Sequence, residues 1–191
     1  EETLPTAVAG LKVLGARGFN LTMPDKNLMV SLCDELSTAA RIIGAVNTVV
    51  NENGRLVGHN TDGIGYMQSV KDAGYDIVGK KMTLLGAGGA ATAILVQASL
   101  DGLKEISVFV RPTSRFYDRL VHTVEELTEI TDCRIRICDF SDADVVFSIL
   151  CVPPGSDFSC LIITVQERKC KRKFMILKCE NVENRKIKKR G

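Results

Sequence analysis

Two ionisable side chains in short polar motifs could move a proton together. Lys26 ends the segment 20–26, Asn-Leu-Thr-Met-Pro-Asp-Lys, and Asp62 stands in the segment 60–63, Asn-Thr-Asp-Gly. Reducing a ketone puts hydride on carbon and a proton on oxygen, and a lysine can deliver that proton when a carboxylate orients it. A lone lysine, however, is usually a solvated charge, and an aspartate before glycine usually forms a turn or caps a helix. The pair is therefore an acid/base candidate only if the fold brings both side chains together.

Neutral hydrogen-bonding side chains accompany the same motifs. They stand at expected strand ends and turns and could bind a polyhydroxylated ligand: Asn20, Thr22, Asn47, Asn60 and Thr61. Because Asn and Thr also stabilise ordinary turns and caps, a purely structural role stays open for each of them.

A glycine-rich turn follows an apolar run at 81–85. Gly86 permits a tight turn, Gly88 lets the backbone approach a pyrophosphate, and the small Ala91 permits close packing of a helix on a strand. The following helix N-terminus would offer N–H groups and partial positive charge to phosphates. The residues expected to bind a dinucleotide are Gly86, Ala87, Gly88, Gly89 and Ala90. A glycine turn that only serves packing is the alternative.

The end of the next expected strand bears on the choice of cofactor. An NAD site usually has an acid there, which binds the ribose 2′-hydroxyl. Residues 110–115 contain no carboxylate and instead offer Arg111, Thr113 and Arg115. Since arginine is a planar, multiple donor for phosphate, we expect these residues to bind the 2′-phosphate of NADP, with NAD as the alternative.

Helices and strands that must hold these groups can be predicted from hydrophobic periodicity and turn residues. Up to residue 74 we expect helix at 4–14, strand at 18–22, a helix from Pro24 carrying Leu28, Leu32 and Leu36, further helix at 34–44, hairpin strands at 48–51 and 55–58 around Asn53-Gly54, and a helix capped by Asp62 that ends near Gly74. Farther on we expect strands at 81–85, 105–110, 133–138, 144–150 and 161–165, with helices at 90–100 and 115–129.

This alternation predicts an α/β fold, a Rossmann-type doubly wound parallel sheet beside an incomplete α/β substrate domain. The expected domains are a partial substrate-binding and catalytic domain at 1–62, an NAD(P)-binding domain at 63–150, and an atypical basic segment at 151–191, which we expect to be disordered.

Composition is that of a globular protein. Of 191 residues, 45% are hydrophobic and 25% charged, and no apolar run reaches the roughly 18 residues of a membrane span. Seven cysteines, an odd number without a Cys-x-x-Cys pair, argue against a metal site or a disulfide framework and favour a reducing, cytoplasmic location. We therefore expect no metal and no membrane partner.

Charge is distributed unevenly along the chain. Residues 165–191 hold 11 Lys/Arg against 3 Asp/Glu, a formal +8, whereas the rest holds 14 against 20, a formal −6. Such a basic segment could bind nucleic acid with strong salt dependence. Because Phe174 is its only aromatic residue for base stacking, we expect no nucleic-acid partner.

Four motifs together resemble the shikimate/quinate dehydrogenase family. They are N-x-T-x-P-x-K at 20–26, G-A-V-N-T at 44–48, N-T-D-G at 60–63 and G-A-G-G-A at 86–90, within a family-like stretch of about 4–146. The resemblance implies reversible NADP- or NAD-dependent oxidation of shikimate to 3-dehydroshikimate, and in some relatives of quinate. It implies acid/base roles for Lys26 and Asp62, and substrate contacts from Thr22, Asn47 and Asp62.

The chain departs from the family pattern in three places. A Ser-x-Ser motif that binds the substrate carboxylate is not found before Glu1, residues 147–151 replace an Asn-Ala-Thr-Ser-like segment, and the basic segment 169–190 lacks the family's substrate-binding Gln. We therefore expect a truncated member, and the abrupt change resembles a shifted reading frame. A non-catalytic NAD(P)-binding module, and a Rossmann dehydrogenase acting on folates or amino acids, are the alternatives. A homodimer is also compatible with the sequence.

Overall fold

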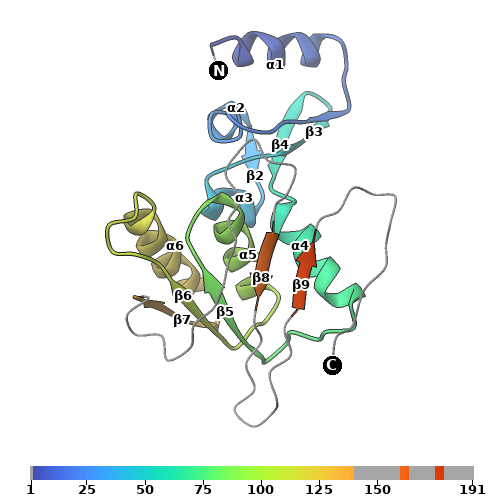
Figure 1. Cartoon of the computed structure of the whole chain (residues 1–191). Helices are drawn as coiled ribbons and strands as arrows, with labels where there is room; N and C mark the ends of the chain where they lie inside the picture. Colours follow the sequence, from blue (N-terminus) through green and yellow to red (C-terminus); the bar gives the residue numbers. More distant parts are fainter. Residues whose placement is uncertain (1, 140–159, 164–174, 179–191) are drawn as a thin grey trace.

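The computed structural model of the chain describes residues 2–139, 160–163 and 175–178. These residues form a four-stranded mixed sheet, called sheet A here, and a three-stranded parallel sheet, called sheet B, with helices around them (Figure 1). Strands β8 (Cys160–Ile163) and β9 (Met175–Lys178) pair antiparallel with each other. Among the helices of the described residues, none has the combination of length and apolar character that a membrane span needs.

Sheet A is built around a β-hairpin. Strands β3 (Thr48–Glu52) and β4 (Arg55–His59) flank Asn53 and Gly54, whose φ angles are 54° and 93°. A two-residue type I′ turn requires positive φ at both positions, which explains the Asn-Gly pair and confirms the expected hairpin. Strand β1 (Gly18–Asn20) pairs with β3 and strand β2 (Glu35–Leu36) with β4, so that the order is β1-β3-β4-β2.

Helices beside sheet A differ in part from the prediction. Helix α1 (Leu4–Val13) confirms the first expected helix. Helix α2 is only Met29–Leu32 and begins well after Pro24, while Leu36 lies in β2, so the expected second helix is too long at both ends.

Continuous helix over 34–44 is also wrong, because α3 (Thr38–Ile43) is separate. Two side chains explain the break. The Leu56 N–H donates to Asp34 Oδ2 at 2.7 Å and ties this segment to β4, and the Ala40 N–H donates to Ser37 Oγ at 3.2 Å, which caps the start of α3.

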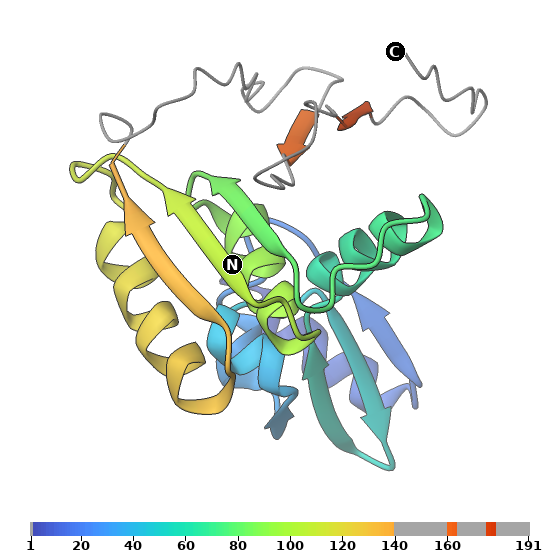
Figure 2. The ribbon, with the colours of Figure 1, turned by 90° about the horizontal axis from the view of Figure 1, so that it is seen from below.

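Sheet B has the expected strand–helix alternation. Its parallel strands are β5 (Lys81–Leu85), β6 (Glu105–Phe109) and β7 (Arg134–Cys138), in that order. Helices α5 (Gly89–Leu100) and α6 (Tyr117–Ile130) make the two connections. Figure 2 shows the three strands side by side with their arrowheads toward one edge. The turns that follow β5 and β6 therefore lie at the same edge, which is where doubly wound sheets bind ligands.

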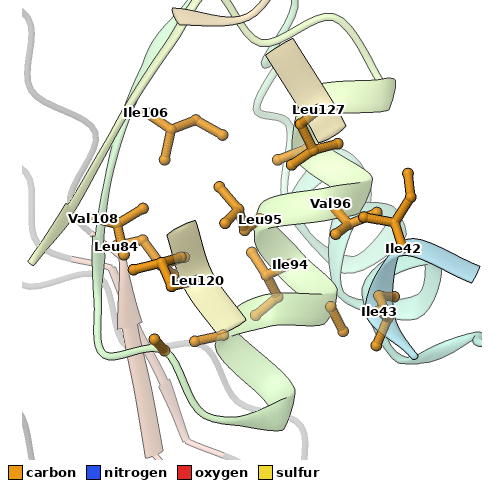
Figure 3. Close-up of a cluster of buried hydrophobic side chains, with 14 of the residues drawn as sticks. Ile42, Ile43, Leu84, Ile94, Leu95, Val96, Ile106, Val108, Leu120 and Leu127 are labelled. Carbon is orange, nitrogen blue, oxygen red and sulfur yellow. The ribbon is translucent and has the colours of Figure 1, made fainter. Parts of the chain in front are cut away.

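The main core lies between sheet B and its helices. Leu84, Ile106 and Val108 are almost fully buried and face Leu95 of α5, as Figure 3 shows. Helix α6 contributes Leu120 and Leu127, and α3 contributes Ile42 and Ile43 to the same cluster. The shared apolar contacts attach the region of sheet A firmly to sheet B.

Along β5, buried side chains alternate with more exposed ones. Met82 and Leu84 of β5 are buried toward the helices, whereas Lys81 and Thr83 belong to the opposite face. In β6, Glu105 lies on that opposite face and accepts hydrogen bonds from Lys81 Nζ at 2.9 Å and Arg136 Nη2 at 2.5 Å. These contacts hold the pKa of Glu105 below its usual value, chiefly through the Lys81 hydrogen bond.

Helix α4 (Asp62–Asp72) connects the two regions and packs against α5. The approach is closest at Gly63, where an added Cβ would lie 2.3 Å from the Ala93 carbonyl oxygen. Only glycine fits such a contact without moving one helix. The expected domain boundary after residue 62 coincides with the start of α4 and stays a prediction. The expected strand at 144–150, the departure at 147–151 and most of the basic segment lie outside the described residues.

Candidate active site

Lys26 and Asp62 are brought together by the fold. The ammonium of Lys26 donates a 2.8 Å hydrogen bond to Asp62 Oδ2, across 36 positions of sequence. The Lys26 side chain is only 18% exposed and that of Asp62 44%, so solvent still reaches the carboxylate. The distance between Lys26 Nζ and Asp62 Oδ2 therefore meets the condition for an acid/base pair, which is that the fold brings both side chains together.

The backbone around Lys26 is held from two sides. Residues 22–25 turn back on themselves, with the Asp25 N–H donating to the Thr22 carbonyl oxygen at 3.0 Å. The Val46 N–H donates to the Lys26 carbonyl oxygen at 2.8 Å, linking this turn to the segment that enters β3. Among the described residues the Thr22 hydroxyl makes no hydrogen bond, which leaves it free to bind a ligand.

Asp62 does not cap α4, which corrects the prediction. It is the first residue of that helix, Thr61 is the N-cap, and no side-chain cap bond is formed there. The carboxylate instead receives Lys26 on one oxygen and the Asn47 side-chain amide, at 2.8 Å, on the other. The positive end of the helix dipole also favours a carboxylate at this position.

Asn47 is buried and connects Asp62 with two threonines. Its Oδ1 accepts from the Thr61 N–H at 3.0 Å, the Thr61 hydroxyl at 3.2 Å and the Thr48 hydroxyl at 3.0 Å. Asn20 donates to Thr48 Oγ1 at 2.9 Å. Thr48 was not among the candidates, although its position directly after Asn47 at the beginning of a strand was a usable signal.

Asn60 has a structural role in this arrangement. It is buried, its Nδ2 donates to the Ala45 carbonyl oxygen at 3.0 Å, and its Oδ1 accepts from the Asp62 N–H at 3.2 Å. Of the five neutral candidates, Asn60 therefore supports the start of α4, while the others line the surroundings of Asp62 or the Lys26 turn.

The glycine turn between β5 and α5 has the backbone that a dinucleotide needs. Gly86 has a φ of 90° and its N–H donates to the Phe109 carbonyl oxygen at 2.8 Å, which joins the turn to β6. An added Cβ at Gly86, Gly88 or Gly89 would meet no atom of the described residues within 4 Å. Because α5 begins without a side-chain cap, its first N–H groups are not taken by a side chain. The turn therefore fits a pyrophosphate.

Helix α5 begins at this turn and packs against α4, whose first residue is Asp62. Ala93, whose carbonyl oxygen contacts Gly63, lies four residues after Gly89, which is about 6 Å along a helix. Asp62 directly precedes Gly63. A Cβ added at Gly63 would also lie 2.8 Å from Gln97 Cβ, so the start of α4 packs against the middle of α5.

Arg111, Thr113 and Arg115 follow β6 and are exposed. They form a turn, with the Ser114 N–H donating to the Arg111 carbonyl oxygen at 2.9 Å. The Arg115 guanidinium lies 4.7 Å from the centre of the Phe116 ring. Since β5 and β6 are in parallel register, with Leu85 opposite Phe109, these residues and the glycine turn lie at one edge of sheet B.

Comparisons with known proteins place this geometry in a family. Residues 1–49 match the model of the shikimate dehydrogenase substrate binding domain. A shikimate dehydrogenase (NADP(+)) of Listeria monocytogenes serotype 4b is 51% identical over 142 residues, which are 74% of this chain and 48% of the relative. The matched part of this chain belongs to the shikimate/quinate dehydrogenase family. A quinate/shikimate dehydrogenase of Escherichia coli is also 45% identical over 141 residues, 74% of this chain and 49% of the relative.

A solved structure of a family member supports the fold. The shikimate 5-dehydrogenase of Listeria monocytogenes, in complex with shikimate and NAD, has a TM-score of 0.71 and 51% identity, and the match covers 74% of this chain and 49% of that one. The α/β fold with a Rossmann-like parallel sheet is thereby confirmed. The chain spans about half the length of the curated relatives it matches. Within the described residues no group of three or more His, Cys, Asp or Glu side chains could hold a metal ion.

Proposed function

We propose that the protein acts as a shikimate dehydrogenase, with quinate as a second substrate class. The observation that carries the proposal is the 2.8 Å hydrogen bond from Lys26 to Asp62, which pairs an amine and a carboxylate from two separate motifs. A half-exposed carboxylate beside a largely covered ammonium is suited to exchange a proton with a substrate hydroxyl.

In the oxidation direction the substrate hydroxyl gives its proton to the Lys26–Asp62 pair, and in the reduction direction the pair returns it. Asp62 keeps Lys26 in place because its other oxygen is held by Asn47. Thr22, Asn47 and Asp62 would bind the substrate hydroxyls. Thr22 supports this role because its hydroxyl is unused among the described residues.

The glycine turn would hold the dinucleotide through Gly86, Ala87, Gly88, Gly89 and Ala90. The bound nicotinamide supplies the hydride acceptor or donor for this reaction. Arg111, Thr113 and Arg115 would contact the 2′-phosphate of NADP from the same edge of sheet B. NADP is favoured by these residues and by the name of one relative, while NAD stays the alternative, as the Listeria complex contains it.

Two further proposals concern the setting of the enzyme. We propose the cytoplasm as its location, because seven cysteines without a Cys-x-x-Cys pair favour a reducing compartment. A homodimer stays a prediction for which size-exclusion chromatography with light scattering is the direct test.

The function is tested with the full chain, by turnover of shikimate and of quinate with NADP and with NAD, and by calorimetric binding of each ligand. We expect shikimate and NADP to bind and to react. Binding of NADP without any binding of shikimate would favour the non-catalytic NAD(P)-binding module. Binding of neither would contradict both readings.

A further inference from the structure

We propose that Thr48 is a positioning residue, whose hydroxyl fixes the Asn47 side-chain amide and thereby the Asp62 carboxylate. The inference rests on the proposed function only for its effect on turnover. The geometry itself is independent of any ligand. Thr48 begins β3, lies in register with Asn20 of β1 and His59 of β4, and is half-buried.

The orientation of the Asn47 amide follows from its neighbours. The Thr61 backbone N–H can only donate, so the Asn47 atom 3.0 Å away from it must be the oxygen. The Nδ2 group then faces Asp62 Oδ1 at 2.8 Å, where an oxygen would be repelled by the carboxylate. A rotated amide would therefore lose both contacts at once.

The donors around Asn47 Oδ1 outnumber its lone pairs. A carbonyl oxygen has two lone pairs, and the Thr61 N–H occupies one of them. The hydroxyls of Thr48, at 3.0 Å, and Thr61, at 3.2 Å, compete for the other. One of these two hydroxyl protons is thus available to another acceptor.

Asn20 decides this competition in favour of Thr48. The Asn20 Nδ2 group can only donate, and it lies 2.9 Å from Thr48 Oγ1, so the Thr48 oxygen is the acceptor there. The Thr48 proton must then point elsewhere, and Asn47 Oδ1 at 3.0 Å is a nearer acceptor than Thr61 Oγ1 at 3.4 Å. The result is a chain of donors that runs from Asn20 through Thr48 and Asn47 to Asp62.

Two donors are released by this arrangement. The Thr61 hydroxyl proton can turn to a ligand, because Thr48 fills the second lone pair of Asn47. The second N–H of Asn47 Nδ2 has no acceptor among the described residues. Thr48 therefore prepares neighbouring groups to bind a substrate hydroxyl without contacting the substrate itself.

The test compares Thr48→Val, which has nearly the same shape but no hydroxyl, with Thr48→Ser, which keeps the hydroxyl. We expect Thr48→Val to lower kcat/KM for shikimate about 3- to 10-fold, as for the loss of one hydrogen bond, and to leave KM for NADP unchanged. Thr48→Ser should restore most of the loss. In the Asn47→Ala background Thr48→Val should have little further effect, because Thr48 acts through Asn47. Additive losses, or no rescue by serine, would overturn the inference.

A ligand-free measurement separates this inference from the proposed function. In nuclear magnetic resonance spectra of the full chain, we expect the Asn47 side-chain amide protons to exchange with water about 3- to 10-fold faster in Thr48→Val and at the original rate in Thr48→Ser. Unchanged exchange in Thr48→Val would overturn the positioning role, whatever the activity. If the exchange rates change as expected but the protein binds no shikimate, the proposed function is overturned and the positioning role of Thr48 is not.

Discussion

The regions of sheet A and sheet B present their chemical groups in different ways. Beside sheet A the groups are side chains, and the central carboxylate is held by others, since Asp62 accepts from Lys26 and Asn47. Beside sheet B the groups at the glycine turn are backbone N–H groups at the start of α5, which no side chain caps. The comparison teaches that substitution should damage the first region by removing a functional group and the second by adding atoms.

The largest effect is expected from removing one member of the acid/base pair. Lys26→Ala or Asp62→Asn should lower turnover of shikimate by about 10²- to 10⁴-fold, as expected for lost proton transfer, while NADP affinity stays the same. Steady-state kinetics and calorimetry measure the two quantities.

A second lysine–aspartate pair provides the control. Lys12 and Asp34 lie 3.6 Å apart on the surface, with side chains 38% and 49% exposed, and Lys12→Ala should leave turnover unchanged. Full turnover in both Lys26→Ala and Asp62→Asn would show that sheet A does not supply the acid/base groups.

Added atoms should matter most at Gly63. An alanine there would press on the Ala93 carbonyl oxygen of α5, and we expect a loss of about 1–3 kcal/mol in the free energy of unfolding. Gly65 of the same helix is the matched control, because its added Cβ would meet no atom within 4 Å. Gly65→Ala should raise stability by about 0.5–1 kcal/mol in urea denaturation. Equal changes in the two variants would mean that α4 and α5 do not pack this closely.

Substituting Arg111 tests whether the edge of sheet B binds the 2′-phosphate of NADP. Arg111→Ala should weaken NADP binding about tenfold, because a charge-assisted hydrogen bond to the 2′-phosphate is lost, and should leave NAD binding unchanged. The exposed Arg17, which lies outside both motifs, is the control for general charge effects. An equal loss for both dinucleotides, measured by calorimetry, would contradict contact with the 2′-phosphate.

The smallest effect is expected at Glu105, on the face of sheet B away from its helices. Because the pKa of Glu105 is lowered in the folded protein, its charge stabilises the fold above the unfolded-state pKa of about 4.3, and this contribution disappears as pH falls through the lower folded-state value. Glu105→Gln should cost about 1 kcal/mol at pH 7, since both basic partners are more than half exposed. A difference from the parent that persists at pH 2 in urea titrations would contradict an ionic origin.

Local signals predicted the parts of the fold that depend on neighbouring residues. The Asn53-Gly54 pair predicted the hairpin. The apolar alternation and the small residues predicted the succession of β5, the glycine turn and α5. The prediction of continuous helix over 34–44 was wrong because the structure of this segment depends on a partner distant in sequence. Leu36 matches a helical spacing, but Asp34 bonds to Leu56 and the chain pairs with β4.

The site was predictable in its members but not in its connections. The motifs pointed to Lys26, Asp62 and Asn47. A separation of 36 residues in sequence, however, does not tell how far apart Lys26 and Asp62 lie in space. Asp62 was given the cap role that its sequence position favours, whereas its carboxylate bonds to Lys26 and Asn47. Thr48 belongs to the motif at 44–48, but its hydrogen bond to Asn47 Oδ1, where three donors meet, is visible only in the fold.

The alternation of buried and more exposed side chains along β5 implies that tolerance to mutation also alternates from one residue to the next. Substituting Asp, Asn or Lys at every position of β5 should be ruinous at Met82 and Leu84, whose side chains are at most 6% exposed, and mild at Thr83 between them. A strand covered on both sides by helices would instead be intolerant at each step. A saturation library selected for folded protein would therefore reveal, from survival frequencies alone, which side of β5 meets the helices.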